Sequence, residues 1–536
     1  MPVAKFATPR FSVRLYKSIQ RKPGEAGLPT SERYAAKEAF IDLTPYLGDG
    51  SSITTGKDVR QPAGTFSLTF SDRPNVSGQS MGPVLSTAGL ESVYGLVEPM
   101  DVVEIRMWSG KGICPNPLPI KMRGFVTEIS RGRQMGADGR PVRTVMVSGQ
   151  DYGKILQTFQ ILYLPSYTGS QPLLTGFNFF EQFGETARNT ITGAEFISIL
   201  LDKAINPLLN TLIPQFSPVP RVIIPDLQAS GMMNNSYMQQ EGSVYDLLRG
   251  FLDIGNWNEF FVEDREDGVY LVWRPLPYFD LMSSQATQDL TQQPEQVTIA
   301  DNEIVNLRQA RNDEAVFNYY WVTNQRFDLA DDMYRRVEAF MSGAHNETME
   351  YPNTAHKYYG IRAMYADTVM GPEDVDNQTS GLDEQGQEQR GNAYMDWIQK
   401  RRQVVIDNNH DNVVLEKGQL DMKGGPMRAD GATALKPGDY IRVLDGLMSW
   451  SAYAVGVQDS FQPYRSYITT VQFERGTGFA ERVSVAGGNS PWLKEQAYRG
   501  LAGANDIGNL ANVDPRLKQA FDFLGDNPAT KYLKGL

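Results

Sequence analysis

Short stretches in which apolar and polar residues alternate dominate the first 157 residues of the chain. A period of two is typical of a strand with one buried face, and Gly, Pro, Asp and Asn between the stretches mark turns. Because closing a sheet removes its exposed edges, we predict a first β-barrel over residues 1–157. Its expected strands are RFSVRLYKS (10–18), GTFSLTFSD (64–72), MDVVEIRMW (100–108), RGFVTEIS (123–130) and RTVMVSGQD (143–151).

The period changes after residue 158, where helical spacing begins. Thr192 and Glu195 have the spacing of a capping box, and apolar residues follow at helical positions. Ser243 is the expected cap of a second helix, which carries one apolar stripe. A hairpin that turns at Asp267-Gly268 follows this helix. Residues 158–298 are therefore expected to form an α+β insertion.

Strand character returns over residues 299–476, which we predict to be a second β-barrel with a helix and an acidic loop inserted near 345–410. The loop is GPEDVDNQTSGLDEQGQEQRGN (371–392), which has almost no apolar residues and is interpreted as solvated. Residues 477–536 are expected to be a helical C-terminal extension. The predicted fold class is thus mainly β, with two similar β-barrel domains, an α+β insertion and a short helical C-terminal segment.

An internal repeat supports the prediction of two similar barrels. PMDVVEIRMW (99–108) aligns with PGDYIRVLDG (437–446), through Pro, any residue, Asp and then alternating apolar positions. In each copy the next strand contains Gly and Val, and the third contains Thr-Val. We expect a structural duplication, so that three chains in a ring would present six barrels, a pseudo-sixfold face on a threefold assembly.

Composition and charge narrow the function classes. A length of 536 residues predicts about three or four domains of ~100–200 residues each. The apolar share of 41% is ordinary for a protein with sizeable cores. A single cysteine, Cys114, excludes an intrachain disulfide framework, and three histidines (345, 356 and 410) are too few and scattered to predict a zinc site. The start has no signal-peptide pattern and no apolar run reaches membrane-helix length, so we expect cytoplasmic synthesis without an export signal or stable membrane insertion. A net charge of −12 makes general nucleic-acid binding unfavourable, although DNA could pass along such a surface without adhering.

Several motifs offer chemistry, but each has a structural interpretation. GQSMG (78–82) matches a nucleophile elbow with Ser80 as nucleophile, yet it lies in a β-rich region and is interpreted as a Gly/Ser loop. EDREDG (263–268) could be a glycosidase or calcium site, but its position favours a solvated hairpin turn. Asp459 could be one carboxylate of a hydrolase pair, but with no evident partner it is interpreted as a turn residue at a strand end.

Two further stretches have similar alternatives. FNYYWVTN (317–324) could stack on single-stranded nucleic acid, but without interleaved basic residues it is predicted to be strand and core. The acids between Glu373 and Glu388 could chelate a cation, although their spacing matches no known loop. We therefore predict no catalytic, cofactor-binding or metal-binding residue and no cofactor.

The order of these elements resembles the baseplate hub proteins of contractile phage tails, a family related to the late control proteins and to the hub part of type VI secretion spikes. The resemblance covers roughly residues 60–476. It rests on VMVSGQDYGKIL (145–156), EGSVYDLLRGFLDIGNWNEFFVED (241–264), DNEIVNLRQARNDEAVFNYYWVTN (301–324), LKPGDYIRVL (435–444) and YAVGVQDSFQPYRSYITTVQFERG (453–476).

The resemblance implies tail-tube-like barrels in a non-enzymatic homotrimer that connects a hexameric tail tube to a trimeric central spike and forms part of the DNA-ejection channel. The implied partners are the tube protein or tube initiator, a separate spike protein and baseplate wedge proteins. The implied location is the virion baseplate, assembled in the host bacterial cytoplasm. Residues 477–536 are the expected docking segment for a spike or wedge partner. The alternatives are a tail-associated cell-wall hydrolase and a carbohydrate-binding β-module.

Overall fold

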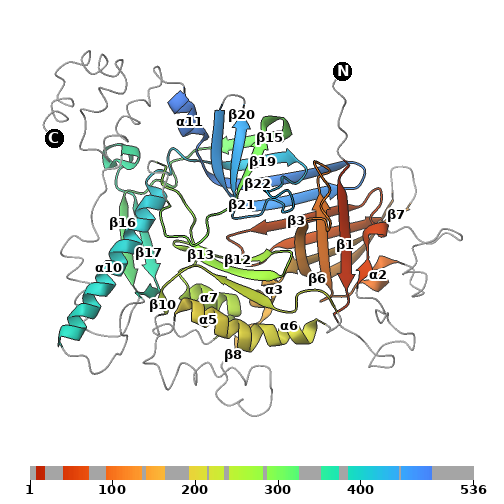
Figure 1. The fold of residues 1–536 in the computed structure, drawn as a ribbon, viewed down its shortest axis with the longest axis horizontal. Coiled ribbons are helices and arrows are strands. Elements are labelled where there is room, and N and C mark those ends of the chain that lie inside the picture. The colour runs from red at the N-terminus through yellow and green to blue at the C-terminus, as the bar shows by residue number, and fades with distance from the viewer. Residues whose placement is uncertain are drawn as a thin grey trace, which may run out of the picture.

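A 13-stranded sheet organises the computed structural model (Figure 1). The structure describes residues 8–18, 40–71, 92–135, 141–162, 192–213, 217–233, 241–281, 286–324, 352–372, 384–445 and 448–485. The strands run in the order β15-β19-β22-β21-β3-β4-β7-β6-β5-β1-β2, and β20 and β14 branch from β21. All but one of the pairings in this sheet are antiparallel, the exception being β14 with β20. The predicted mainly β fold is therefore confirmed.

The sheet divides into two β units of similar construction. The first β unit comprises β1 (Arg10–Tyr16), β2 (Ile41–Asp42), β3 (Ser52–Asp58), β4 (Thr65–Ser71), β5 (Val102–Trp108), β6 (Ile120–Met135) and β7 (Pro141–Asp151). The second β unit comprises β14 (Gln296–Ala300), β15 (Ile304–Ala310), β19 (Glu416–Lys423), β20 (Tyr440–Asp445), β21 (Met448–Gln462) and β22 (Ser466–Gly476). Each unit buries its own apolar core. Figure 1 shows the second unit in green and blue beside the first in red and orange.

All five strands expected in the first β unit are present, and a sixth long strand, β3, escaped prediction. Its sequence SITTGKD places Ile53 and Thr55 on the buried face. Threonine there weakens the apolar alternation on which the prediction depended, although its branched side chain suits a strand. β3 is nevertheless central to the molecule, because it joins the two units.

Strand register confirms the duplication. β5, β6 and β7 pair in sequence, as do β20, β21 and β22. Val102 lies opposite Phe125 in the first unit, and Tyr440 lies opposite Tyr453 in the second. Both long central strands carry a bulge immediately afterwards, in β6 between Val126 and Glu128 and in β21 between Ala454 and Gly456. The bulges fix the correspondence, because Glu128 and Gly456 are the first paired residues beyond them.

The correspondence extends over two more strands in each unit. β7 pairs with β4 and β4 with β3, while β22 pairs with β19 and β19 with β15. Matching leucines occupy the middle of each set: Leu68 lies between Val147 and Ile53, and Leu420 lies between Val471 and Leu307. β3 is therefore the counterpart of β15. The units differ at the opposite edge, where β1 is antiparallel to β5 but β14 is parallel to β20.

The insertion packs its helices and a small sheet against the first β unit. The sheet contains β9 (Ile223–Leu227), β12 (Asn258–Asp264) and β13 (Val269–Pro275), and the helices are α3 (Gly153–Thr158), α5 (Gly193–Leu200), the π-helical η2 (Leu201–Ile205), α6 (Asn206–Leu212) and α7 (Val244–Phe251). The predicted capping box is confirmed, since Thr192 and Glu195 exchange two hydrogen bonds of 3.1 Å. Ser243 caps α7 as predicted, and Asp246 completes a second box there.

A third packing centre lies at the outer edge of the molecule (Figure 1). There the long helix α10 (Glu384–Asn409) covers β16 (Tyr319–Asn324) and β17 (Ala363–Thr368). Tyr320 and Val322 are buried, which confirms the strand-and-core interpretation of residues 317–324. The interpretation of 371–392 as one solvated loop is wrong from Glu384 onwards, because those residues begin α10. Residues 373–383 lie outside the described residues.

The remaining elements are short and connect these parts. They are β8 (Gln160–Leu162), β10 (Met232–Met233), β11 (Glu241–Ser243), β18 (Met370–Gly371), α2 (Val93–Leu96), α9 (His356–Tyr359), α11 (Gly478–Val485), η1 (Thr44–Tyr46), η3 (Asp301–Glu303) and η4 (Pro352–Thr354). α11 begins the expected C-terminal extension, and residues 486–536 lie outside the described part of the chain.

The close packing around Gly149 in the first unit can be tested by substitution. A Cβ at this position would lie 2.3 Å from the carbonyl oxygen of Phe125 and 2.4 Å from Cζ of Phe66. We expect Gly149→Ala to lower the free energy of unfolding by about 1–3 kcal/mol, because the strand backbone must shift. Gly48→Ala is the matched control, since its Cβ would meet nothing within 4 Å. Equal urea-unfolding midpoints for the two variants would contradict this packing.

Candidate functional site: a buried charge network between the two β units

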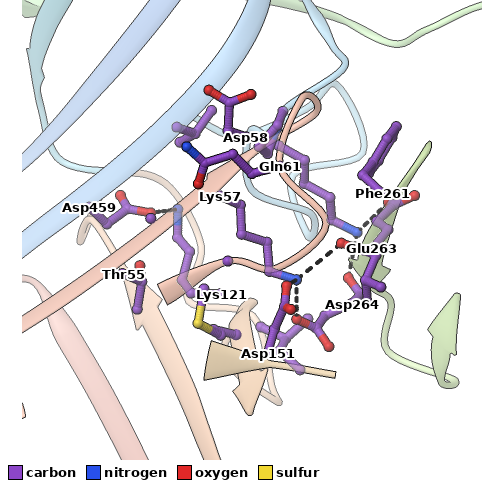
Figure 2. A pocket seen from close by; sticks show the side chains of 18 of the residues that line it. Thr55, Lys57, Asp58, Gln61, Lys121, Asp151, Phe261, Glu263, Asp264 and Asp459 are labelled. Atoms are coloured by element: carbon purple, nitrogen blue, oxygen red, sulfur yellow. Dashed lines mark hydrogen bonds and ion pairs between the residues drawn. The ribbon is translucent and has the colours of Figure 1, made fainter. Parts of the chain in front are cut away.

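The two units are joined by the pairing of β3 with the second half of β21, called the joint here. Six residue pairs form it, from Gly456 opposite Asp58 to Phe461 opposite Ile53. A cavity of about 40 Å³ lies beside the joint, lined by both units and by the insertion (Figure 2). Charged side chains from all three parts of the chain line it. Most of these side chains form ion pairs with one another.

Asp459 holds the two units together by an ion pair. Its carboxylate lies 2.9 Å from Nζ of Lys121, which comes from β6 of the other unit. It also accepts hydrogen bonds from Tyr467 at 3.1 Å and Thr469 at 2.6 Å. The interpretation of Asp459 as a turn residue is wrong, because it lies within β21 and is 3% exposed. The ion-pair partner of Asp459 is a lysine.

Lys57 connects the first β unit to the insertion through two carboxylates. From β3 its ammonium lies 2.9 Å from Asp151 at the end of β7 and 2.7 Å from Asp264 at the end of β12. Burial alone would lower the pKa of Lys57, but these carboxylates outweigh burial and raise it. Burial is also the largest effect on Asp151, whose pKa is raised in spite of Lys57. The lysine is thus charged and satisfied, not a poised base.

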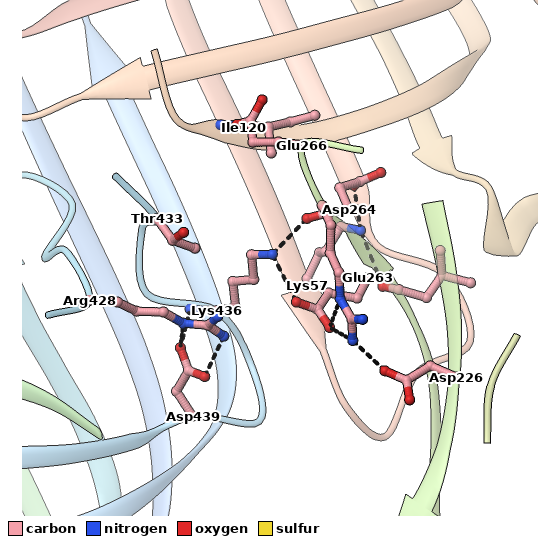
Figure 3. A network of polar contacts seen from close by, with 12 residues as sticks. Lys57, Ile120, Asp226, Glu263, Asp264, Glu266, Arg428, Thr433, Lys436 and Asp439 are labelled. Atoms are coloured by element: carbon pink, nitrogen blue, oxygen red, sulfur yellow. Dashed lines mark hydrogen bonds and ion pairs between the residues drawn. The ribbon is translucent and has the colours of Figure 1, made fainter. Parts of the chain in front are cut away.

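Glu263 and Lys436 extend the network into the second unit (Figure 3). Lys436 Nζ lies 2.8 Å from Glu263 and donates to the carbonyl of Asp264 at 2.7 Å. Burial opposes ionisation of Glu263, but Lys436 and Arg265 prevail and lower its pKa to about 2. The interpretation of residues 263–268 as a solvated turn is therefore wrong for its first two acids, because Asp264 is buried and Glu263 is half-buried.

The exposed end of the same hairpin is also anchored to the first unit. Arg123 of β6 donates to the carbonyl of Arg265 at 2.7 Å, and Arg106 of β5 lies 2.8 Å from Glu266. Glu104 holds both of these arginines, at 2.7 Å from Arg106 and 2.9 Å from Arg123. Sequence reasoning missed this network, because ion pairs such as Lys121 with Asp459 and Lys436 with Glu263 join residues far apart in the chain, and only the Asp-Gly turn left a local signal.

The network is suited to holding elements together. Its carboxylates lie within ion-pairing distance of lysines: Asp151 and Asp264 with Lys57, Asp459 with Lys121, and Glu263 with Lys436. The cavity has room for a few water molecules, whereas pockets for organic ligands measure ~300–1,000 Å³. The arrangement therefore fixes the orientation of three parts of the chain.

A separate buried group contains the histidine that follows α10. His410 Nε2 lies 3.2 Å from Asp411 and 3.5 Å from Asp280, and Nδ1 lies 3.0 Å from the carbonyl of Ile406. Within the described chain, this trio has the geometry to hold a metal ion. Burial alone would lower the pKa of His410, but Asp411 and Asp280 raise it, so an imidazolium also satisfies the group. The predicted absence of a metal site stays a prediction.

Other candidates are not part of these groups. Ser80 and His345 lie outside the described residues. Cys114 is partly exposed, and its sulfur lies 3.8 Å from the guanidinium of Arg10. None of the helices in the described ranges has the length and apolarity needed to cross a bilayer.

Comparison with solved structures identifies similar folds at low sequence identity. A tail protein from Neisseria meningitidis has a TM-score of 0.42 and 10% identity over 88% of this chain and 98% of that chain. The tail protein of prophage MuSo2 from Shewanella oneidensis has 0.40 and 10%, covering 87% and 96%. A type VI secretion component from E. coli has 0.33 and 8%, covering 80% and 73%. No family model and no curated protein matches the sequence.

The ion pair between Lys121 and Asp459 gives a quantitative test of the joint. We expect Lys121→Met to cost about 3–5 kcal/mol of unfolding free energy, because it leaves Asp459 charged and buried. The double variant K121M/D459N should recover part of this loss. Arg465→Met is the matched control, since Arg465 and Asp49 are 3.4 Å apart but both 63% exposed, and it should cost less than about 0.5 kcal/mol. Urea unfolding that ranks the two variants equally would refute the role of the pair.

The raised pKa of His410 predicts a specific pH dependence. A raised folded-state pKa stabilises the protein below the unfolded-state pKa of 6.5, and this contribution disappears as pH rises through the folded-state value. His410→Asn should therefore destabilise the protein more at pH 5.5 than at pH 9, in thermal unfolding with EDTA present. In a D411N background the dependence should weaken, because the nearer carboxylate is neutral. A penalty independent of pH would exclude the imidazolium.

Proposed function

We propose that this protein is a non-enzymatic structural component of a contractile phage tail, the baseplate hub, and that it assembles as a homotrimer. The observation that carries the proposal is the duplication: two β units with matching register, bulges and strand order in one chain. Three copies would present six equivalent units in a ring. Such a ring matches a sixfold partner through its β units and a threefold partner through the parts that occur once per chain.

The buried joint supports a mechanical role within this proposal. A component between two assemblies must keep its units in fixed orientation under load. The joint combines six backbone pairs with ion pairs from β6 and the insertion. Because these charges are buried and paired, breaking one contact leaves the partner charge buried without compensation, which is strongly unfavourable. The two units therefore behave as one rigid piece.

The acids that favoured a hydrolase have structural partners here. Asp459 is paired with Lys121, and Glu263 is paired with Lys436. A general acid or base must reach its substrate within hydrogen-bonding distance, and buried neutralised carboxylates do not. These contacts support a non-enzymatic protein over a cell-wall hydrolase.

The finer assignments rest on the resemblance of the sequence to hub proteins. They comprise the tail tube protein or tube initiator on the sixfold side, the central spike on the threefold side, and wedge proteins around the ring. DNA would pass through the lumen without sequence-specific binding, and the acidic chain, at −12, is compatible with that passage. The protein would be part of the virion baseplate and assemble in the host cytoplasm.

Oligomeric state tests the proposal directly. Light scattering should give the mass of three 59.9 kDa chains, and class averages from electron microscopy should show six density lobes around a lumen. Tube and spike proteins expressed from the same tail operon should co-purify with the ring. A monomer that degrades peptidoglycan would favour the hydrolase, and a monomer that binds glycan arrays would favour the carbohydrate-binding module.

A further inference from the structure

Two of the strand edges left open among the described residues belong to β15 and to β6. β15 ends the sheet and pairs only with β19. Residues 128–135 of β6, called the distal half here, pair with β7 on one side and with no described strand on the other. Open edges offer unpaired N–H and C=O groups, so they are templates for another strand. Neither edge is shielded by proline within these stretches.

The duplication supplies an internal precedent for the partner of each edge. The distal half of β6 corresponds to the half of β21 that follows its bulge, and β15 corresponds to β3. Inside the chain, that half of β21 and β3 pair with each other to form the joint. The two open edges are therefore the two halves of a second joint, which a single copy does not close.

Equivalent apolar residues are more deeply buried at the joint than at the open edges. At the joint, Val457 is 7% exposed and Ile53 is fully buried. Their counterparts at the open edges are Ile129 and Leu307, which pack against the two cores but are only partly buried. A strand laid along each edge would cover these apolar side chains as the joint covers theirs, which adds hydrophobic stabilisation to the backbone pairing.

The geometry points to a docking contact between copies: we propose that β15 of one copy pairs antiparallel with the distal half of β6 of the next copy, in the register of the joint. The inference rests on the ring proposed above and specifies its contact. Transferring the joint register places Ser130 opposite Ala310 of the neighbouring copy, and Gly132 opposite Arg308 of that copy.

The residue pairs along the two edges are compatible with this register. The remaining pairs are Glu128 with Asn312, Ile129 with Arg311, Arg131 with Gln309 and Arg133 with Leu307. No pair places like charges directly opposite each other, which would be destabilising. The contact joins different surfaces of the two copies, so it is heterologous and generates a closed ring when the rotation between copies permits closure.

Disulfide cross-linking tests the register. The variant S130C/A310C in a C114S background should form covalent dimers and trimers on mild oxidation, seen on a non-reducing gel. Directly opposed residues have Cα atoms ~4.5–5.5 Å apart, within the range of a disulfide. Both residues are exposed, so neither substitution disturbs a core. S130C alone and A310C alone should stay uncross-linked, because a heterologous contact never brings two copies of one position together.

Two matched controls define the geometry. G56C/Q458C reproduces the same pair inside the joint and should give an intrachain disulfide, since a Cβ on Gly56 meets Gln458 Cγ at 4.0 Å. S130C/Q309C shifts the register by one residue and directs the second thiol to the opposite face of the sheet, so it should cross-link poorly.

The outcomes separate this inference from the proposed function. A trimer by light scattering in which S130C/A310C does not cross-link, or in which S130C/Q309C cross-links equally well, overturns the strand pairing and leaves the ring intact. Cross-linking by S130C alone indicates an isologous contact and also overturns it. A protein that is monomeric at all concentrations contradicts the ring itself.

Discussion

The structure depends on the fact that a strand longer than its neighbour must find another partner for its remaining length. β21 pairs with β20 up to its bulge and with β3 beyond it. Buried backbone groups without partners are strongly unfavourable, so the second half of β21 requires a neighbour. The bulge sharpens the local twist and redirects the strand, which brings the two units into contact. The continuous sheet, the joint and the cavity follow from this change of partner.

Buried charges give the joint its specificity at some cost in stability. An apolar seam would stabilise the contact without fixing its register, because apolar contacts are not directional. In the observed register Lys121 lies within ion-pairing distance of Asp459 across the joint, and Lys57 lies between two carboxylates. A one-residue slip would move these side chains to the opposite face and leave charges unpaired. The ion pairs therefore fix the register of strands that carry few large apolar residues.

Local patterns in the sequence predicted much of the fold but little of the network. Alternation predicted β1 and β4 to β7, and the repeat correctly aligned residues 99–108 with 437–446. β3 was missed because Thr55 takes the place of an apolar residue on its buried face. Asp459 was misplaced because Gln458, Asp459 and Ser460 look like a turn, whereas a lysine more than three hundred residues away makes a buried carboxylate acceptable. Long-range charge pairs leave no periodic signal, so only the structure could reveal them.

The two β units are equivalent, but a different segment of the chain follows each of them. α3 begins two residues after the end of β7, and α11 begins two residues after the end of β22. After β7 the first unit continues into the insertion, which packs against that unit and pairs Asp264 with Lys57. The second unit continues into the C-terminal extension. In a ring of three copies, the β units would repeat six times while each attachment would repeat three times. The change from sixfold to threefold symmetry would therefore need no distortion of the sheet. It would arise because the insertion follows β7, whereas the C-terminal extension follows the equivalent strand β22.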